Sequence, residues 1–140
     1  MAALSSHFLE AILFLSLFLL APRGQAQVYT TYNQYDPAAK NYQLDGLYCA
    51  TYSAHQPLSW RSQYKWTAMD ASLGMGPQMC GQCLEVVTNI ATGAQIVVRV
   101  LDQSSNGGLD LETDAFNTID TDGGGYASGH LYTSYTSFSC

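Results

Sequence analysis

From residue 27 onward, hydrophobic and polar residues alternate in short runs, a pattern typical of half-buried β-strands. Five segments rich in β-branched and aromatic residues predict strands, at residues 27–35, 47–53, 84–88, 95–101 and 131–138. Residues 89–93, Asn-Ile-Ala-Thr-Gly, predict a hairpin turn between the third and fourth strands, in which Gly93 supplies a positive φ. The pattern therefore predicts a mainly β domain.

Two short helices are predicted to interrupt the strands. Residues 57–64 begin with Pro57, which is favoured in the first turn of a helix. Residues 111–119 place four apolar side chains on one helical face, those of Leu111, Ala115, Phe116 and Ile119. The glycines at 123–125 are predicted to end that second helix. Short strands with two short helices predict a small closed β-barrel, because closure removes exposed sheet edges.

The first 26 residues are predicted to be a signal peptide outside the fold. Residues 11–21 form an uncharged apolar run, too short for a membrane span of about 20 residues and within the roughly 7–15 of a secretory segment. Gly24 and Ala26 supply the small residues that precede a cleavage site at Gln27. Glu10 and the lack of Lys and Arg ahead of the run depart from this pattern, and a buried helix is the alternative. We expect a secreted domain at residues 27–140 and no membrane span.

Composition and charge limit the possible functions. The 140 residues are 47% hydrophobic and 11% charged, which suits one folded domain and not two. Residues 27–140 contain ten acidic residues and four basic ones, Lys40, Arg61, Lys65 and Arg99. Nucleic-acid-binding modules normally carry the opposite balance. We therefore expect no binding to DNA, whereas RNA as an enzyme substrate stays open.

Four cysteines, Cys49, Cys80, Cys83 and Cys140, follow the signal peptide. An even number in a secreted chain predicts disulfides, and three pairings are possible. The Cys-Gly-Gln-Cys segment at 80–83 is a weaker candidate for a redox or zinc site, because it lacks a βαβ context and a second pair of ligands. No metal or other cofactor is expected.

Eight short blocks identify a family resemblance. They are C-A-T at 49–51, P-L-S-W-R-S at 57–62, W-T-A at 66–68, C-G-x-C-L at 80–84, A-T-G-A-Q-I at 91–96, D-Q at 102–103, N-G-G-L-D-L at 106–111 and G-H-L at 129–131. In this order they resemble the barwin domain of class-four plant pathogenesis-related proteins, in the short form without a hevein-type chitin-binding module. The resemblance covers residues 27–140. It implies a double-psi β-barrel, secretion to the apoplast or vacuole, and defence against fungi and bacteria.

The resemblance also implies a disulfide pattern. The family usually has three bridges, and two of the six cysteine positions are here occupied by Asp70 and Ser104. Those two positions would be partners, so one whole bridge is missing and no thiol is left over. The remaining pairs would be Cys49–Cys80 and Cys83–Cys140. A monomer is expected for such a disulfide-stabilised secreted barrel.

Two aspartates are candidates for a glycan site. Asp102 ends the apolar run of a predicted strand, and Asp110 follows an Asn-Gly-Gly turn; converging carboxylates can divide acid and base roles. By resemblance to the related barrel of expansins and some endoglucanases, Thr31, Asp102 and Asp110 would line a polysaccharide groove for chitin or β-glucan. Tyr32 and Trp60 are the aromatic rings predicted to stack on sugars. The structural interpretation is that Asp110 caps a helix and Asp102 accepts hydrogen bonds from loop amides.

Two further activities stay open besides glycan binding. Some barwin proteins degrade RNA, and the resemblance assigns that reaction to two histidines and an arginine. His130 matches the second histidine and Arg61 is the candidate arginine, with Asp102 as a further catalytic candidate, but Asn33 occupies the first histidine position. Asparagine cannot exchange a proton near neutral pH, which weakens this alternative. The other alternative is an expansin-like modification of the wall. The alternative to a catalytic role is a structural one for each side chain. His130 would then only form a hydrogen bond within the fold, and Arg61 would form an ion pair with a carboxylate.

Overall fold

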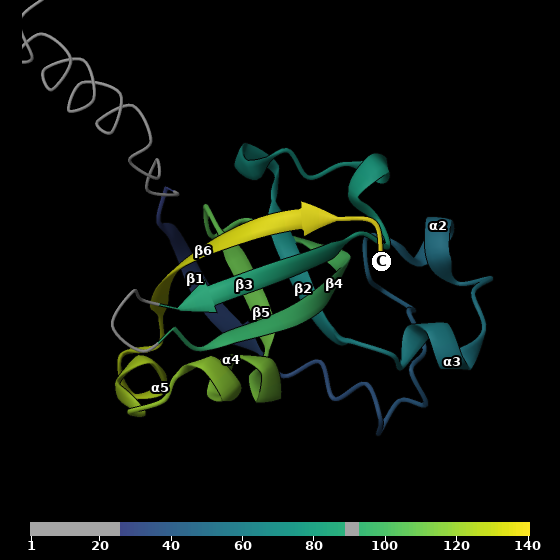
Figure 1. The fold of residues 1–140 in the computed structure, drawn as a ribbon. Helices are drawn as coiled ribbons and strands as arrows, with labels where there is room; N and C mark the ends of the chain where they lie inside the picture. Colours follow the sequence, from purple (N-terminus) through teal and green to yellow (C-terminus); the bar gives the residue numbers. More distant parts are fainter. Residues whose placement is uncertain (1–25, 89–92) are drawn as a thin grey trace, which may run out of the picture.

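The computed structural model describes residues 26–88 and 93–140 as a closed six-stranded barrel (Figure 1). The strands are β1 (Val28–Asn33), β2 (Lys65–Asp70), β3 (Cys83–Thr88), β4 (Gln95–Ser104), β5 (Leu109–Glu112) and β6 (Leu131–Phe138). The α-helices are α2 (Ala50–Ser53), α3 (Leu58–Arg61), α4 (Thr113–Ile119) and α5 (Gly124–Ser128), and the 3-10 helices are η1 (Ala71–Leu73) and η2 (Pro77–Met79).

Strands from distant parts of the chain alternate around the barrel. The order is β1-β5-β2-β4-β3-β6, closed by the pairing of β6 with β1. The pairs β1/β5 and β2/β4 are parallel and the other four are antiparallel. This arrangement confirms the predicted mainly β barrel with short helices. The described residues contain four short α-helices, whereas the sequence predicted two.

The barrel interior is filled by alternate side chains of the strands, because successive residues of a strand point to opposite faces. Six aliphatic side chains at its centre have no exposed surface, those of Leu84, Val86, Val98, Val100, Leu109 and Leu111. Thr30 and Thr133 are also buried and pair through their hydroxyls at 2.8 Å. Helix α4 covers one end of the barrel with Ala115, Phe116 and Ile119, and α5 follows it there (Figure 1).

Several predicted elements are different in the structure. Residues 47–53 are not a strand but a turn leading into α2, because Cys49 is buried and anchored through its amide to the Leu101 carbonyl at 3.1 Å. The second helix begins at Thr113, since Leu111 belongs to β5. The glycines at 123–125 do not end this helix, which stops at Ile119; Gly123, with φ +74°, instead precedes α5.

Other predictions are confirmed or lie outside the described residues. The strand at 131–138 is β6, and β3 and β4 pair as an antiparallel hairpin. The helix predicted at 57–64 is present as the shorter α3, Leu58–Arg61, and Pro57 immediately precedes it. The predicted signal peptide, apart from Ala26, and residues 89–92 of the predicted turn lie outside the described residues, and Gly93 has φ +62°. Across residues 26–88 and 93–140, no helix has the length and apolar character to cross a membrane.

Hydrogen bonds stand in the place of the missing third bridge. The structure contains the disulfides Cys49–Cys80 and Cys83–Cys140, the pairs that the resemblance implies. Asp70 and Ser104 are direct neighbours across the parallel pair β2/β4. The Asp70 carboxylate accepts hydrogen bonds from the amides of Ser72 at 2.8 Å and Gly107 at 2.9 Å. A carboxylate therefore holds the 104–108 turn to the end of β2.

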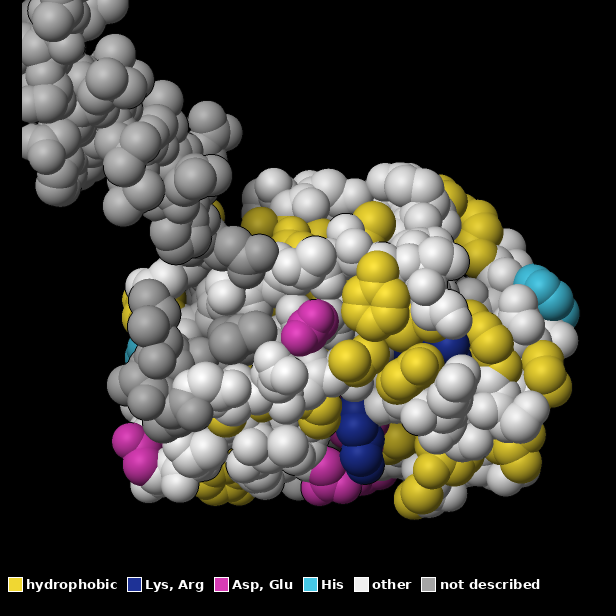
Figure 2. Space-filling model, in the orientation of Figure 1, with side chains coloured by type: hydrophobic (Ala, Val, Ile, Leu, Met, Phe, Trp, Pro, Cys, Tyr) yellow, Lys and Arg dark blue, Asp and Glu magenta, His cyan; other side chains and the backbone are white. Residues whose placement is uncertain are grey.

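Basic side chains are scarce on the described surface. Lys and Arg form only small patches on the face that carries β3, β4 and β6, with acidic side chains beside the larger patch (Figure 2). Lys65 Nζ lies 2.9 Å from Glu112 Oε1 and 3.0 Å from Asp114 Oδ2. Arg61 Nη1 donates to the Tyr42 carbonyl at 2.7 Å. Three of the four basic side chains, those of Lys65, Arg61 and the buried Arg99, thus contact groups of the protein itself.

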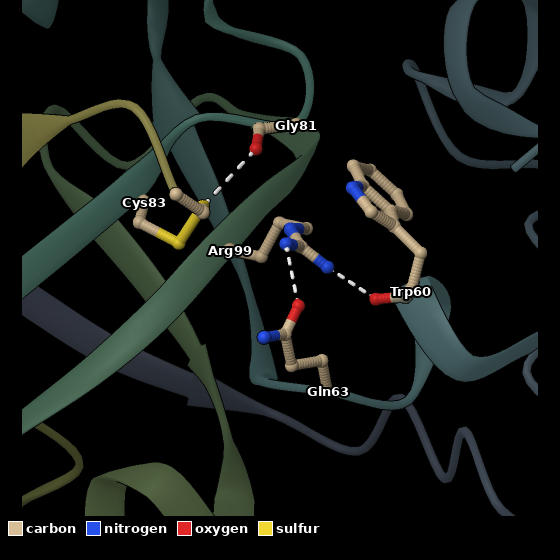
Figure 3. Close-up of a disulfide and its surroundings, with 6 residues drawn as sticks. Trp60, Gln63, Gly81, Cys83 and Arg99 are labelled. Atoms are coloured by element: carbon tan, nitrogen blue, oxygen red, sulfur yellow. Dashed lines mark hydrogen bonds between the residues drawn. A yellow bond between two sulfur atoms is a disulfide. The ribbon is translucent and has the colours of Figure 1, made fainter.

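Arg99 is a buried cation that holds α3 against the barrel (Figure 3). Its side chain is 1% exposed, and its guanidinium carbon lies 3.8 Å from the centre of the Trp60 ring. Nη1 donates to the Trp60 carbonyl, Nη2 donates to Gln63 Oε1 at 3.2 Å, and Nε has no partner among the described residues. Gly81 allows the ring to approach, because a Cβ there would meet Trp60 at 3.0 Å.

Candidate functional site

Three polar side chains and one alanine form a row across four adjacent strands on the outward face of the barrel. The strand register places Thr31 of β1 beside Asp110 of β5, Asp110 beside Ala68 of β2, and Ala68 beside Asp102 of β4. Thr31, Ala68, Asp102 and Asp110 are called the polar row here. Ala68, whose side chain is a single methyl group, lies between the two aspartates in the strand register and is buried.

Hydrogen bonds orient one end of the polar row. Thr31 Oγ1 donates to Asp110 Oδ1 at 2.6 Å. Asn106 Nδ2 donates to Thr31 Oγ1 at 2.8 Å and also to the Leu109 carbonyl at 2.9 Å. Because the Thr31 hydroxyl accepts from Asn106, its proton points to the carboxylate of Asp110. Asn106 sits in the turn that Asp70 holds, so the site depends on that turn.

Asp102 is held at the other end by two donors. Its Oδ1 accepts from the Tyr48 amide at 2.9 Å, and its Oδ2 accepts from the Tyr35 hydroxyl at 3.3 Å. Burial raises the pKa of Tyr35 far above its ordinary value, and the charges of Asp102 and Asp110 raise it further. The phenol therefore stays protonated at any physiological pH and acts as a fixed donor to Asp102.

The surroundings of Asp110 oppose its negative charge. Partial burial raises the pKa of its carboxyl group above the ordinary value, and the charge of Asp102 adds to this rise, whereas the Thr31 hydrogen bond opposes it. Two carboxyl groups on one face can divide the roles of acid and base. The same two groups can bind sugar hydroxyls, since a carboxylate accepts and a protonated carboxyl also donates.

The raised pKa of Asp110 predicts a pH-dependent stability. A carboxyl group whose pKa is higher in the folded chain contributes stability below its unfolded pKa, and this contribution is lost as the pH rises through the folded pKa. Asp110→Asn keeps an acceptor for Thr31 and removes the charge. We expect its melting temperature at neutral pH to equal or exceed that of wild type, with the difference shrinking toward acid in melts between about pH 3 and pH 7. A variant that melts lower at neutral pH would contradict this.

The other sequence candidates divide into two groups. Asn33 lies on β1 with Thr31, on the outward side, and its carbonyl oxygen accepts a hydrogen bond from the Tyr35 amide at 3.0 Å. His130 adjoins the row through Tyr29, on which its imidazole stacks with ring centres 4.9 Å apart. These two positions therefore flank the polar row, toward opposite ends of β1.

Tyr32, Trp60 and Arg61 are not brought to the carboxylates. The Tyr32 ring packs on Tyr126 and Phe116, each at 4.9 Å between ring centres, toward the helices α4 and α5. Trp60 covers Arg99, and Arg61 contacts the Tyr42 carbonyl. The two rings predicted at the groove thus pack against other side chains, and the Arg61 guanidinium is hydrogen-bonded to a backbone carbonyl.

The structural interpretations of the candidates have different outcomes. A helix-capping role for Asp110 is wrong, because Asp110 lies inside β5 and α4 begins at Thr113. A loop-amide role for Asp102 is confirmed by its bond with Tyr48. Arg61 is not in an ion pair, since both ion pairs of the described residues involve Lys65. The His130 imidazole makes ring contacts and no hydrogen bond within the described part of the chain.

Sequence reasoning missed three contributors to the row. Tyr35, Asn106 and the Tyr48 amide orient its side chains but come from segments outside the predicted strands or at their ends. Asn106 belongs to the same N-G-G-L-D-L block as Asp110, which could have indicated it. Cys80 and Cys83 belong to separate disulfides, and the described residues hold no cluster of three His, Cys, Asp or Glu suited to a metal ion.

A comparison with protein families identifies the chain. The model of the Barwin family matches residues 24–140. The chain belongs to the Barwin family. The match includes every described strand and both disulfides, so this barwin domain accounts for the whole barrel.

Solved structures share the fold of this barwin domain at low sequence identity. Cerato-platanin 3 from M. perniciosa has a TM-score of 0.60 and 19% identity, over 81% of this chain and 94% of the other. The expansin of Clavibacter michiganensis has a TM-score of 0.53 and 21% identity, over 81% of this chain and 50% of the expansin. A variant of that expansin, solved with cellohexaose, has a TM-score of 0.55. The barwin chain thus spans about half of the expansin.

Proposed function

We propose that this barwin protein is a secreted plant defence protein that binds a neutral β-linked cell-wall glycan, of chitin or β-glucan type, along the polar row. The observation that carries the proposal is the alignment of Asp102 and Asp110, held by Thr31, Asn106 and Tyr35 on the outward face of the barrel. Fixed carboxylates and hydroxyls are suited to the many hydroxyl groups of a sugar chain. The expansin structure solved with cellohexaose, which has the same fold, supports the choice of ligand.

Charge favours a neutral glycan over RNA. The phosphates of RNA would meet two carboxylates in the row, and like charges repel more strongly where water is partly excluded. Arg99 is buried, Lys65 is paired with two carboxylates, and Arg61 is bound to a carbonyl. Asn33 supplies no proton for the cleavage that the barwin ribonucleases perform. The proposed role is therefore binding, with wall modification or RNA cleavage as outcomes that the experiment distinguishes.

The proposal predicts measurable binding that depends on Asp110. The full chain, expressed in a secretory host, should give heat on titration with cellohexaose or chitohexaose. Asp110→Asn should bind at least about tenfold more weakly, since hydrogen bonds with charged groups contribute about 1.5–3 kcal/mol. Asp45→Asn is the matched control and should bind like wild type. It removes an exposed carboxylate that forms no hydrogen bond or ion pair within the described residues.

The outcomes separate the alternatives. An absence of heat with cellohexaose, chitohexaose and laminarihexaose would overturn the proposed function. Release of new reducing ends from the same oligosaccharides would place the protein among wall-modifying enzymes and require both carboxylates for the reaction. Cleavage of RNA that disappears in His130→Ala would establish the ribonuclease alternative in place of glycan binding.

A further inference from the structure

Three aromatic side chains form a cluster on the outward face, next to the polar row. Tyr29 of β1 and Tyr132 of β6 are directly opposite across an antiparallel pair, with ring centres 6.0 Å apart. His130 stacks on Tyr29 at 4.9 Å and meets Tyr132 edge-on at 5.6 Å. Tyr29, His130 and Tyr132 are called the aromatic cluster here.

The aromatic cluster offers both apolar surface and free polar edges. Tyr29 is 38% exposed and Tyr132 is 52% exposed, so neither ring is buried in the core. Neither phenol hydroxyl and neither nitrogen of the His130 imidazole forms a hydrogen bond with the described residues. An exposed ring with an unused donor or acceptor at its edge matches a pyranose, which has an apolar face and a rim of hydroxyls.

The cluster continues the polar row rather than forming a separate surface. Tyr29 and Thr31 are two residues apart on β1, so their side chains leave the strand on the same face. The rise of a strand puts them about 7 Å apart along β1. A ligand that contacts Thr31 and Asp110 therefore reaches Tyr29 when it extends toward β6.

We propose that Tyr29, His130 and Tyr132 form an aromatic subsite that stacks on a terminal pyranose ring of a neutral β-linked glycan lying along the polar row. This inference rests on the proposed function, because the subsite extends the same binding surface. A nucleobase could also stack on such rings. The acidic balance of the domain and the two carboxylates of the row select the uncharged ligand.

The subsite predicts a loss of affinity that depends on ligand length. Cellotriose and cellohexaose, or the corresponding chitin oligomers, are titrated into wild type and into Tyr132→Thr, which retains a residue favoured in strands. We expect Tyr132→Thr to bind the hexasaccharide about tenfold more weakly, equivalent to about 1.4 kcal/mol, with a smaller effect on the trisaccharide. Tyr132→Phe, which preserves the ring, should retain most of the affinity.

A control on the same strand separates stacking from changes in β6. Phe138 is 39% exposed and lies six residues further along β6, away from the cluster, so Phe138→Thr should bind both oligosaccharides like wild type. In the unaltered protein, the hexasaccharide should shift the NMR signals of the His130 imidazole. These shifts test the subsite even where Tyr132→Thr folds poorly.

The results distinguish a failure of the aromatic subsite from a failure of the proposed glycan binding along the polar row. Wild-type affinity of Tyr132→Thr for both lengths, with unshifted His130 signals, would overturn the subsite and leave glycan binding by the row intact. Binding of RNA oligomers, and not of glycans, that weakens in Tyr132→Thr would overturn the assigned ligand class. An absence of all glycan binding by wild type would overturn both proposals.

Discussion

Replacing Arg99 with alanine should lower the free energy of unfolding by roughly 3–5 kcal/mol, the range of large-to-small substitutions in cores. The change removes a fully buried side chain between β4 and α3 and leaves the Trp60 carbonyl and Gln63 without their donors. It also removes the cation from the faces of Trp60 and Tyr64, which lie 3.8 and 5.0 Å from the guanidinium carbon. We expect α3 to detach early in unfolding.

Urea unfolding followed by tryptophan fluorescence tests this expectation, because Trp60 covers the substituted side chain. Arg99→Met is the informative companion: it fills much of the volume and removes a buried charge that has no carboxylate partner among the described residues. It should be destabilised less than Arg99→Ala. Arg99→Lys should not restore wild-type stability, because an ammonium lacks the planar fork that reaches Trp60 and Gln63 together. A loss below about 1 kcal/mol for Arg99→Ala would contradict the role assigned to Arg99.

Combining Asp70→Cys with Ser104→Cys should create a third disulfide and raise the free energy of unfolding by up to roughly 3–4 kcal/mol, the chain-entropy value for a loop of this length. The two residues are neighbours in the parallel pair β2/β4, where strand spacing is about 4.8 Å and within the Cα range of disulfides. The loss of the Asp70 hydrogen bonds to Ser72 and Gly107 reduces this gain.

The double alanine variant, Asp70→Ala with Ser104→Ala, separates the two effects because it removes the same hydrogen bonds without adding a bridge. It should be less stable than wild type, and the difference between the two double variants measures the bridge. Thermal melts with and without a confirmed third disulfide provide the comparison. A bridged protein no more stable than the double alanine variant would show that the 104–108 turn does not accept the link.

Acid should also distinguish wild type from the bridged variant. Hydrogen bonds from the amides of Ser72 and Gly107 lower the pKa of Asp70 below its ordinary value. A carboxyl group with a lowered pKa contributes stability above its unfolded pKa, and this contribution is lost as the pH falls through the folded pKa. In wild type the turn that carries Asn106 is therefore less firmly held in acid. The bridged variant lacks this dependence.

Local patterns predicted some elements of the barrel well and others not at all. The strands β3, β4 and β6 alternate or run apolar between turns, and this local signal indicated them. Strand β2 was missed because Trp66 to Asp70 are all buried, so its sequence shows no alternation. Strand β5 is four residues long and merges with the apolar pattern of α4, which is why Leu111 was placed in a helix.

The candidate site was predicted in part for similar reasons. Asp102 and Asp110 belong to recognisable blocks, D-Q at 102–103 and N-G-G-L-D-L at 106–111, and the family resemblance links them with Thr31. The sequence predicts Tyr32 and Trp60 as exposed rings, because nothing local distinguishes a ring on the surface from one that packs on Phe116 or Arg99. Tyr29, which has the outward position on β1, carries no motif of its own.

By itself, the sequence determined the mainly β class, because the local pattern of apolar and polar residues indicates strands. Its short blocks also carried the resemblance that gave the family and the two positions at which a bridge is missing. Only the tertiary structure decided which donors hold Asp102 and Asp110, that Arg99 is buried without a counter-charge, and that Tyr29, His130 and Tyr132 meet. The physical reason is register: these contacts join strands far apart in the chain, and a shift of one residue would turn each side chain to the opposite face.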